Sequence, residues 1–205
     1  MVDDQVEQIL TALEKNGYGE NTIVFFASDN GAYWKPEFIE QFNHRSNFVF
    51  RGMKSDAWDG GHHIPFIVKW PGKIQAGSIS DQTTSLTDFF ATVRNLLGKD
   101  DAGNPRDSYS LLPVLLGEKS SINRAPVIHH SGGGKFAIRD GNWKMIEGLG
   151  SGGFTQPAFP EPKPGEPNGQ LYNLKKDISE QENLYLTEPE KVEELKIKLK
   201  EIRGY

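Results

Sequence analysis

Residues 22–31 have the sequence TIVFFASDNG, an apolar run that ends in an acid, an amide and a glycine. The β-branched and aromatic side chains of this run predict a buried strand. Ligands bind at the carboxyl ends of strands in open α/β sheets, and Asp29 and Asn30 offer the hard oxygen atoms that Ca²⁺ or Mg²⁺ prefers. The stretch suggests a metal or anion site at a strand end, but Asp-Asn-Gly is also ordinary turn chemistry, and from these residues alone we favour the turn.

The composition of the chain indicates a globular protein of one or two domains. Of its 205 residues, 11% are aromatic and 25% are charged, which is typical of a folded core with a solvated surface. The net charge is −5 and no basic stripe is present, so we expect no nucleic-acid partner. No apolar stretch reaches membrane-spanning length, so we expect no membrane partner. Because cysteine is absent, this chain contains no disulfide, thiolate metal site or cysteine nucleophile.

Further elements are predicted around the first strand. Apolar residues at helical spacing predict a helix over residues 3–16, and a helix that leads into an apolar strand is typical of a parallel sheet. A second apolar strand is predicted at 64–70 and another helix at 86–97. Residues 31–63 show no periodicity, and a loop of that length inside a compact domain is usually functional.

The pattern changes after residue 120. Short strands are predicted at 127–130, 136–139, 143–146 and 170–173, with an Asp-Gly hairpin turn between the second and third, and a helix at 189–203. These elements predict a small antiparallel sheet with a terminal helix. We therefore divide the chain into an α/β portion at 1–120 and a small α+β subdomain at 121–205.

A set of short motifs follows the first strand in a fixed order. They are Ser28-Asp29-Asn30-Gly31, Gly52-Met53-Lys54, Asp59-Gly60-Gly61, Pro65, Trp70-Pro71-Gly72, Ser110 to Gly117, and Leu171 to Leu184. In this order they resemble the sulfatase family of the alkaline-phosphatase-like superfamily. The resemblance covers essentially the whole chain and implies an alkaline-phosphatase-like parallel-sheet sandwich followed by the small subdomain.

The resemblance also implies a function, that of a sulfuric ester hydrolase. Asp29 and Asn30 match the metal ligands of the family, usually for Ca²⁺, although Mg²⁺ suits the same oxygen atoms. Lys54 matches the lysine that contacts the sulfate group and its leaving oxygen; its alternative is a solvated surface lysine. Gly60 and Gly61 would permit a tight backbone path beside the site.

The chain also departs from the family pattern. Sulfatases use a formylglycine made within a Cys/Ser-x-Pro-x-Arg motif, and that motif does not occur here. The resemblance places the remaining metal ligands, a second lysine and the catalytic histidines upstream of this chain. We therefore expect a C-terminal portion of a sulfatase that does not hydrolyse sulfate esters alone. Family members are often periplasmic, secreted or lysosomal, and the sequence leaves the compartment open.

Several residues are weaker candidates for substrate contacts. His62 and His63 stand where the family often has other residues, and Arg51 and His44 lie in the long loop. The alternative for the histidine pair is that one faces solvent and the other packs beneath the strand near Pro65. The expected ligand is a sulfated small molecule or a sulfated carbohydrate, and self-association or pairing with the missing N-terminal portion is a further expectation. A phosphatase or phosphodiesterase of the same superfamily, or a non-catalytic remnant with a structural or binding role, remains an alternative.

Overall fold

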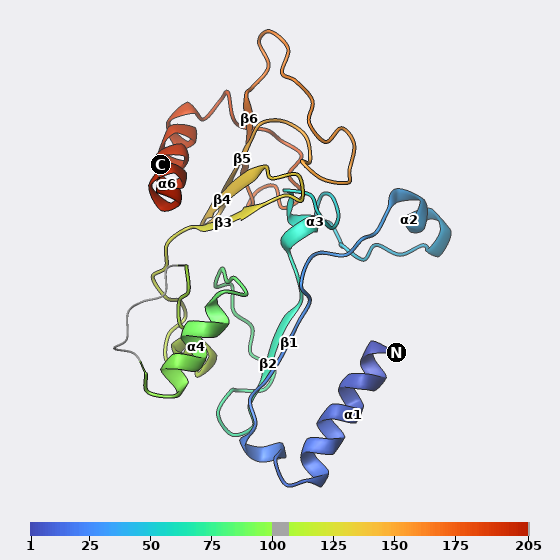
Figure 1. Cartoon of the computed structure of the whole chain (residues 1–205), viewed down its shortest axis with the longest axis vertical. Helices are drawn as coiled ribbons and strands as arrows, with labels where there is room; N and C mark the ends of the chain where they lie inside the picture. Colours follow the sequence, from blue (N-terminus) through green and yellow to red (C-terminus); the bar gives the residue numbers. More distant parts are fainter. Residues whose placement is uncertain (100–106, 205) are drawn as a thin grey trace. The chain divides into compact units, whose positions relative to one another are not determined.

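The computed structural model describes residues 1–99 and 107–204, which form two compact units. The first unit comprises residues 1–27 and 65–124, and the second comprises residues 28–64 and 125–205. Figure 1 shows the elements of both along the chain. The segment 28–64 thus belongs with the C-terminal sheet in this chain, although the predicted domain boundary near residue 120 stays a prediction for the complete protein.

The first unit contains a helix, a two-stranded sheet and two further helices. Its elements are α1 (Val2–Lys15), the 3₁₀ turn η1 (Gly19–Asn21), β1 (Val24–Ala27), β2 (Phe66–Lys69), α4 (Asp88–Leu96) and α5 (Leu112–Leu115). The predicted helices and strands are therefore present. β1 and β2 pair antiparallel, with Val24 opposite Lys69, so the parallel arrangement that we expected is not found in this pair. Apolar composition predicts that a strand is buried but does not encode the direction of its neighbour.

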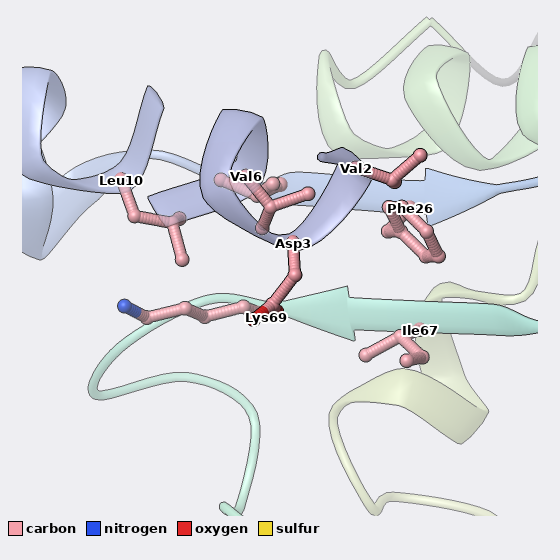
Figure 2. Close-up of a pocket in the computed structure, with 8 residues that line it drawn as sticks. Val2, Asp3, Val6, Leu10, Phe26, Ile67 and Lys69 are labelled. Carbon is pink, nitrogen blue, oxygen red and sulfur yellow. The ribbon is translucent and has the colours of Figure 1, made fainter. Parts of the chain in front are cut away.

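The apolar face of the first unit is only partly covered. α1 has no buried residue although its apolar side chains form one stripe, and no residue of β1 is buried. A cleft of about 430 Å³ lies between α1 and the two strands (Figure 2). It is lined by Val2, Asp3, Val6, Leu10, Val24, Phe26, Ile67 and Lys69.

The second unit is built on the predicted antiparallel sheet. Its strands β3 (Val127–His130), β4 (Phe136–Asp140), β5 (Trp143–Glu147) and β6 (Gly169–Asn173) pair in that order. The helix α6 (Pro189–Arg203) lies on one face, and the segment that contains α3 (Asp59–His62) lies on the other (Figure 1). The predicted antiparallel sheet and terminal helix are confirmed, and the whole confirms an α/β class.

Strand alternation divides the side chains of this sheet between two layers, because neighbouring residues of a strand point to opposite faces. Ile138, Met145 and Leu171 pack against Val192, Leu195 and Leu199 of α6. Their neighbours Ala137, Ile146 and Tyr172 pack against Ala57 and Trp58, which precede α3. The sheet therefore packs against the long loop that carries the predicted site residues. These contacts explain why residues 28–64 form one compact unit with the C-terminal part of the chain. The same loop contains a second short helix, α2 (Pro36–Phe42).

Within the described ranges, none of the helices combines the length and the apolar character that crossing a bilayer requires.

Candidate functional site

The acid–amide pair lies in the turn directly after β1. Asp29 is exposed and Asn30 is partly buried. The hydroxyl of Ser28 donates to the carbonyl of Asn30 at 2.8 Å, and Nδ2 of Asn30 donates to the carbonyl of Gly31 at 3.0 Å. Because the amide nitrogen is held by the backbone, the side-chain oxygen of Asn30 is directed away from that contact and can accept from a ligand.

Glycines allow three segments of backbone to meet behind this turn. The amide of Gly31 donates to the carbonyl of Gly61 at 2.9 Å, and a Cβ on Gly31 would lie 1.9 Å from the carbonyl oxygen of Gly60. A Cβ on Gly60 would in turn lie 2.4 Å from the carbonyl oxygen of Gly52. No side chain fits in either place, so the prediction of a tight backbone path at Gly60 and Gly61 is confirmed.

Asn47 joins the turn to the segment that carries Lys54. Its amide oxygen accepts from the amide of Ala32 at 3.0 Å, and its Nδ2 donates to the carbonyls of Ala32 at 3.0 Å and Gly52 at 3.2 Å. The amide of Lys54 also donates to the carbonyl of Ala32, at 3.0 Å. The backbone of Lys54 is thus hydrogen-bonded to Ala32, which is two residues after Asn30 in the chain. Lys54 itself is exposed. Sequence reasoning missed Asn47, since nothing local distinguishes it from any loop asparagine.

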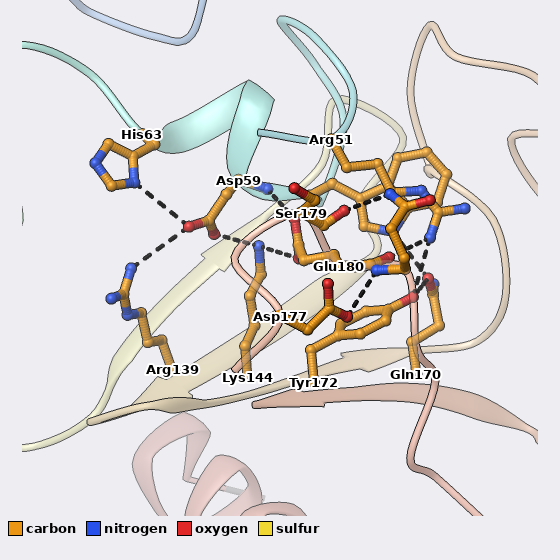
Figure 3. Close-up of polar contacts among 12 residues, drawn as sticks. Arg51, Asp59, His63, Arg139, Lys144, Gln170, Tyr172, Asp177, Ser179 and Glu180 are labelled. Atoms are coloured by element: carbon orange, nitrogen blue, oxygen red, sulfur yellow. Dashed lines mark hydrogen bonds and ion pairs between the residues drawn. The ribbon is translucent and has the colours of Figure 1, made fainter. Parts of the chain in front are cut away.

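A buried ion cluster fastens α3 to the sheet (Figure 3). Nζ of Lys144, on β5, lies 2.7 Å from Oδ1 of Asp59 and 2.9 Å from Oε1 of Glu180. The second oxygen of Glu180 accepts from the backbone amide of Asp59 at 2.6 Å. Lys144 and Glu180 are fully buried, and the guanidinium of Arg139 lies 3.5 Å from Asp59. Sequence reasoning missed Lys144 and Glu180; the available signal was a lysine within an apolar strand.

The pKa values of the two carboxyl groups of this cluster shift in opposite directions. Burial raises the pKa of Asp59, but the charge of Lys144, the His63 contact and the charge of Arg139 outweigh it and hold that pKa below its usual range. Burial raises the pKa of Glu180, and Lys144 offsets this only in part because the neighbouring Asp59 charge adds to it. Asp59 therefore carries the negative charge that Lys144 neutralises.

The two adjacent histidines have different surroundings. The ring of His63 is 44% exposed, stacks on Phe50 with centroids 3.9 Å apart, and places Nδ1 3.4 Å from Asp59 (Figure 3). The ring of His62 packs against His129 with centroids 3.9 Å apart, and its Nε2 is buried without a hydrogen-bond partner. Burial, together with the charge of Lys144, lowers the pKa of His62 to about 4 and that of His129 well below its ordinary value. His62 is therefore neutral at pH 7.

The side chains of Arg51 and His44 make contacts of their own, different from those of the histidine pair. The guanidinium of Arg51 lies 3.8 Å from the centre of the Trp58 ring and donates to the carbonyl of Glu180 at 2.7 Å and to the hydroxyl of Tyr172 at 3.3 Å. These contacts direct it into the loop–sheet interface (Figure 3). His44 is exposed beside Trp34, whose Nε1 donates to its carbonyl at 2.7 Å. The structure thus connects the Asp29 turn, Lys54 and α3 through their backbones, whereas His44 belongs to a separate aromatic cluster.

Comparison with known proteins supports the resemblance found in the motifs. The family model described as Sulfatase matches residues 1–99 of this chain. The N-acetylgalactosamine-6-O-sulfatase of Bacteroides thetaiotaomicron is 31% identical over 210 residues, a match that covers 98% of this chain and 40% of that protein.

The chain belongs to the sulfatase family.

Two further sulfatase-like matches agree with this assignment. An arylsulfatase from Hemicentrotus pulcherrimus is 38% identical over 142 residues, covering 69% of this chain and 25% of that protein. A structure solved in work on glycosaminoglycan metabolism by Bacteroides thetaiotaomicron superimposes with a TM-score of 0.82 at 29% identity, covering 100% of this chain and 43% of that one. The chain thus spans about a quarter to two fifths of the length of these relatives and corresponds to their C-terminal part, with the alkaline-phosphatase-like fold.

Sulfatases in general use a divalent metal and a formylglycine. The carboxylate of Asp29 and the amide oxygen of Asn30 are hard donors that fit Ca²⁺ or Mg²⁺. In the part of the chain that the structure describes, no group of three or more histidine and acidic side chains is placed to hold a metal ion. Since Ca²⁺ takes about six to eight oxygen ligands, the donors present fit a portion of such a shell.

Replacing Lys144 by methionine should destabilise the second unit by about 3–5 kcal/mol, because the buried Glu180 would lose its cation and the buried Asp59 its nearest one. The measurement is urea unfolding followed by circular dichroism. Lys196→Met is the matched control: Lys196 pairs with Glu193 on the exposed face of α6, and its loss should cost less than about 1 kcal/mol. Equal stabilities of the two variants would contradict a structural role for the buried cluster.

The stability of the chain should fall as the pH is lowered from 7 to 5. The folded state holds His62 neutral with a pKa of about 4, whereas the unfolded chain takes up the proton near the ordinary value of 6.5. The stability that His62 contributes is therefore complete above pH 6.5 and is lost as the pH falls toward 4. His62→Gln should reduce the difference in unfolding free energy between pH 7 and pH 5 by on the order of 1–2 kcal/mol. The exposed His44→Gln should keep the difference, and a His62→Gln profile parallel to the original chain would refute the assignment.

Proposed function

We propose that this chain supplies part of the active site of a sulfuric ester hydrolase, in which Asp29 and Asn30 ligate Ca²⁺ and Lys54 contacts the sulfate group. The observation that carries the proposal is the set of backbone and Asn47 hydrogen bonds that joins the segment after Asn30 to the segment of Lys54. The amide of Lys54 and both groups of the Asn47 amide meet at Ala32, two residues after Asn30. A lysine and two oxygen donors distant in sequence are thereby held on one small framework.

The chemistry of these groups suits a sulfate monoester. The substrate is an anion, and negative charge grows on the leaving oxygen as the S–O bond breaks. The exposed ammonium group of Lys54 can bind the sulfate and stabilise that oxygen, because a fixed positive charge acts where the charge develops. A bound divalent metal would add Lewis-acid stabilisation of the same charge. The turn after β1 orients the amide of Asn30, and Asp29 stands next to it in the same turn.

The proposed site needs further residues from outside this chain. The sequence contains no cysteine and no Ser-x-Pro-x-Arg, so the chain has no candidate for the formylglycine. Two oxygen donors also leave most of a Ca²⁺ shell unfilled. We infer that the isolated chain is inactive and pairs with the residues that complete the site. The cleft beneath α1 supports this, because its apolar strands and helix offer a surface for such a segment or for a second copy (Figure 2).

The proposed substrate class is a sulfated carbohydrate. Matches to arylsulfatase and steryl-sulfatases cover 63–71% of this chain, whereas the match to the N-acetylgalactosamine-6-O-sulfatase covers 98% of it. The structure from work on glycosaminoglycan metabolism covers 100% of this chain, and the N-acetylgalactosamine-6-sulfatases of mouse, rat and dog each match 70% of it. These matches favour a sulfated sugar over an aryl or steryl ester as the substrate.

A chimera tests this function. This chain should replace the corresponding 40% of the Bacteroides thetaiotaomicron N-acetylgalactosamine-6-O-sulfatase, and the chimera should hydrolyse N-acetylgalactosamine 6-sulfate while the chain alone does not. In the chimera, Lys54→Ala should lower kcat/KM by on the order of 10²-fold, because it removes a charge that stabilises the leaving group. The exposed Lys73→Ala is the control and should leave the rate unchanged.

Two results would contradict the proposal. One is a Lys54→Ala chimera as active as its parent, and the other is turnover of an aryl sulfate by the purified chain. Hydrolysis of 4-nitrophenyl phosphate in preference to 4-nitrophenyl sulfate would instead favour a phosphatase of the same superfamily.

A further inference from the structure

Two large aromatic side chains are kept together at the surface of the second unit. Tyr33 is 45% exposed and Phe154 is 54% exposed. Their ring centroids lie 5.6 Å apart and the rings are nearly perpendicular, at 85°. Single exposed apolar residues need no explanation, but two rings held in contact leave a joint apolar surface that water solvates poorly.

The loop that carries Phe154 is fixed against the residues that follow Lys54. The amide of Thr155 donates to the buried carboxylate of Asp56 at 3.0 Å, and the Thr155 hydroxyl donates to it at 2.5 Å. A Cβ on Gly153 would lie 2.3 Å from the carbonyl oxygen of Ser55, so the two backbones are in direct contact. Phe154, between these anchors, is therefore held beside the segment that begins at Lys54.

Tyr33 lies on the segment that follows the Asp29 turn, and this segment is hydrogen-bonded to the backbone of Lys54. It follows Ala32, whose carbonyl accepts from the amide of Lys54 at 3.0 Å. Nζ of Lys35 lies 5.6 Å from the centre of the Tyr33 ring. The ammonium group of Lys35 thus lies beside the rings, the backbone of Lys54 is hydrogen-bonded to the residue before Tyr33, and the Asp29 turn lies just before Tyr33 in the chain.

We propose that Tyr33 and Phe154 form a binding platform for the sugar ring whose sulfate group Lys54 contacts. This inference rests on the proposed function and specifies its substrate. A sugar ring has an apolar C–H face that packs on an aromatic ring and a polar rim that stays in water, which suits half-exposed rings. The Lys35 ammonium beside the rings, and the exposed Lys54 on the adjoining segment, complement a sulfated ligand. An aryl or steryl group would instead favour an enclosed apolar pocket.

The test is saturation-transfer NMR on the 205-residue chain with N-acetylgalactosamine 6-sulfate as the probe. Irradiation of the aromatic protons should transfer saturation to the sugar ring protons more than to the N-acetyl methyl group. Phe154→Ala should weaken binding about two- to tenfold, the range that an aromatic contact contributes. Phe154→Trp should retain binding. Phe159→Ala is the matched control, because Phe159 is 58% exposed in the same part of the chain but packs near Lys135 and Gly133.

The outcomes separate the platform from the proposed function. Absence of saturation transfer to the sugar sulfate, or equal losses in Phe154→Ala and Phe159→Ala, overturns the platform. Phe154-dependent binding of 4-nitrophenyl sulfate without binding of the sugar sulfate overturns the ligand class. If Phe154→Ala weakens sugar binding while Lys54→Ala and the removal of the sulfate group change nothing, the platform stands and the role of Lys54 fails.

Discussion

The contact between the backbones at Gly31, Gly60 and Gly52 is the constraint on which the site depends. The hydrogen bond from Gly31 to Gly61 brings the turn after β1 against α3, at a separation that excludes any side chain. With these segments in contact, the hydrogen bonds at Ala32 can fix Lys54 near Asn30. The proposed metal donors Asp29 and Asn30 and the proposed sulfate-binding Lys54 thereby acquire a common backbone framework. Preorganisation of this kind is what electrostatic catalysis requires, because the charges do not have to be moved into place during the reaction.

The buried ions make that framework part of the C-terminal sheet. Lys144 lies between Asp59 and Glu180, and the Glu180 carboxylate also accepts from the amide that begins α3. Burying three ionic groups is costly, and replacing all of them by apolar residues is often neutral or stabilising. The cluster therefore serves to fix position more than to add stability. Trp58 and Arg51 pack beside it, so the loop is attached to the sheet by both apolar and ionic contacts.

Local patterns in the sequence accounted for the regular elements and for the order of the motifs. The stripe of Leu195 and Leu199 predicted α6, and alternation with an Asp-Gly turn predicted β4 and β5, because these signals are local. The antiparallel pairing of β1 with β2 could not be predicted, since direction depends on the path of the intervening chain. Asn47, Lys144 and Phe154 were missed for a related reason: each acts on a residue far away in the sequence. Asp29, Asn30 and Lys54 were accessible only as members of an ordered set.

Amide hydrogen exchange of the isolated chain, resolved by NMR, tests the central claim most directly. The claim is that this chain holds the Asp29 turn, the Lys54 segment and α3 together by itself. The amides of Gly31, Lys54 and Gly60, which donate to Gly61, Ala32 and Arg51, should exchange far more slowly than those of an unstructured peptide. The amide of Lys119, which donates to the carbonyl of Pro113 at 3.1 Å outside this framework, provides a hydrogen-bonded comparison in the first unit. Exchange of Gly31 and Lys54 at the rate of an unstructured peptide would contradict the account, because the donors and the cation would then have no common framework.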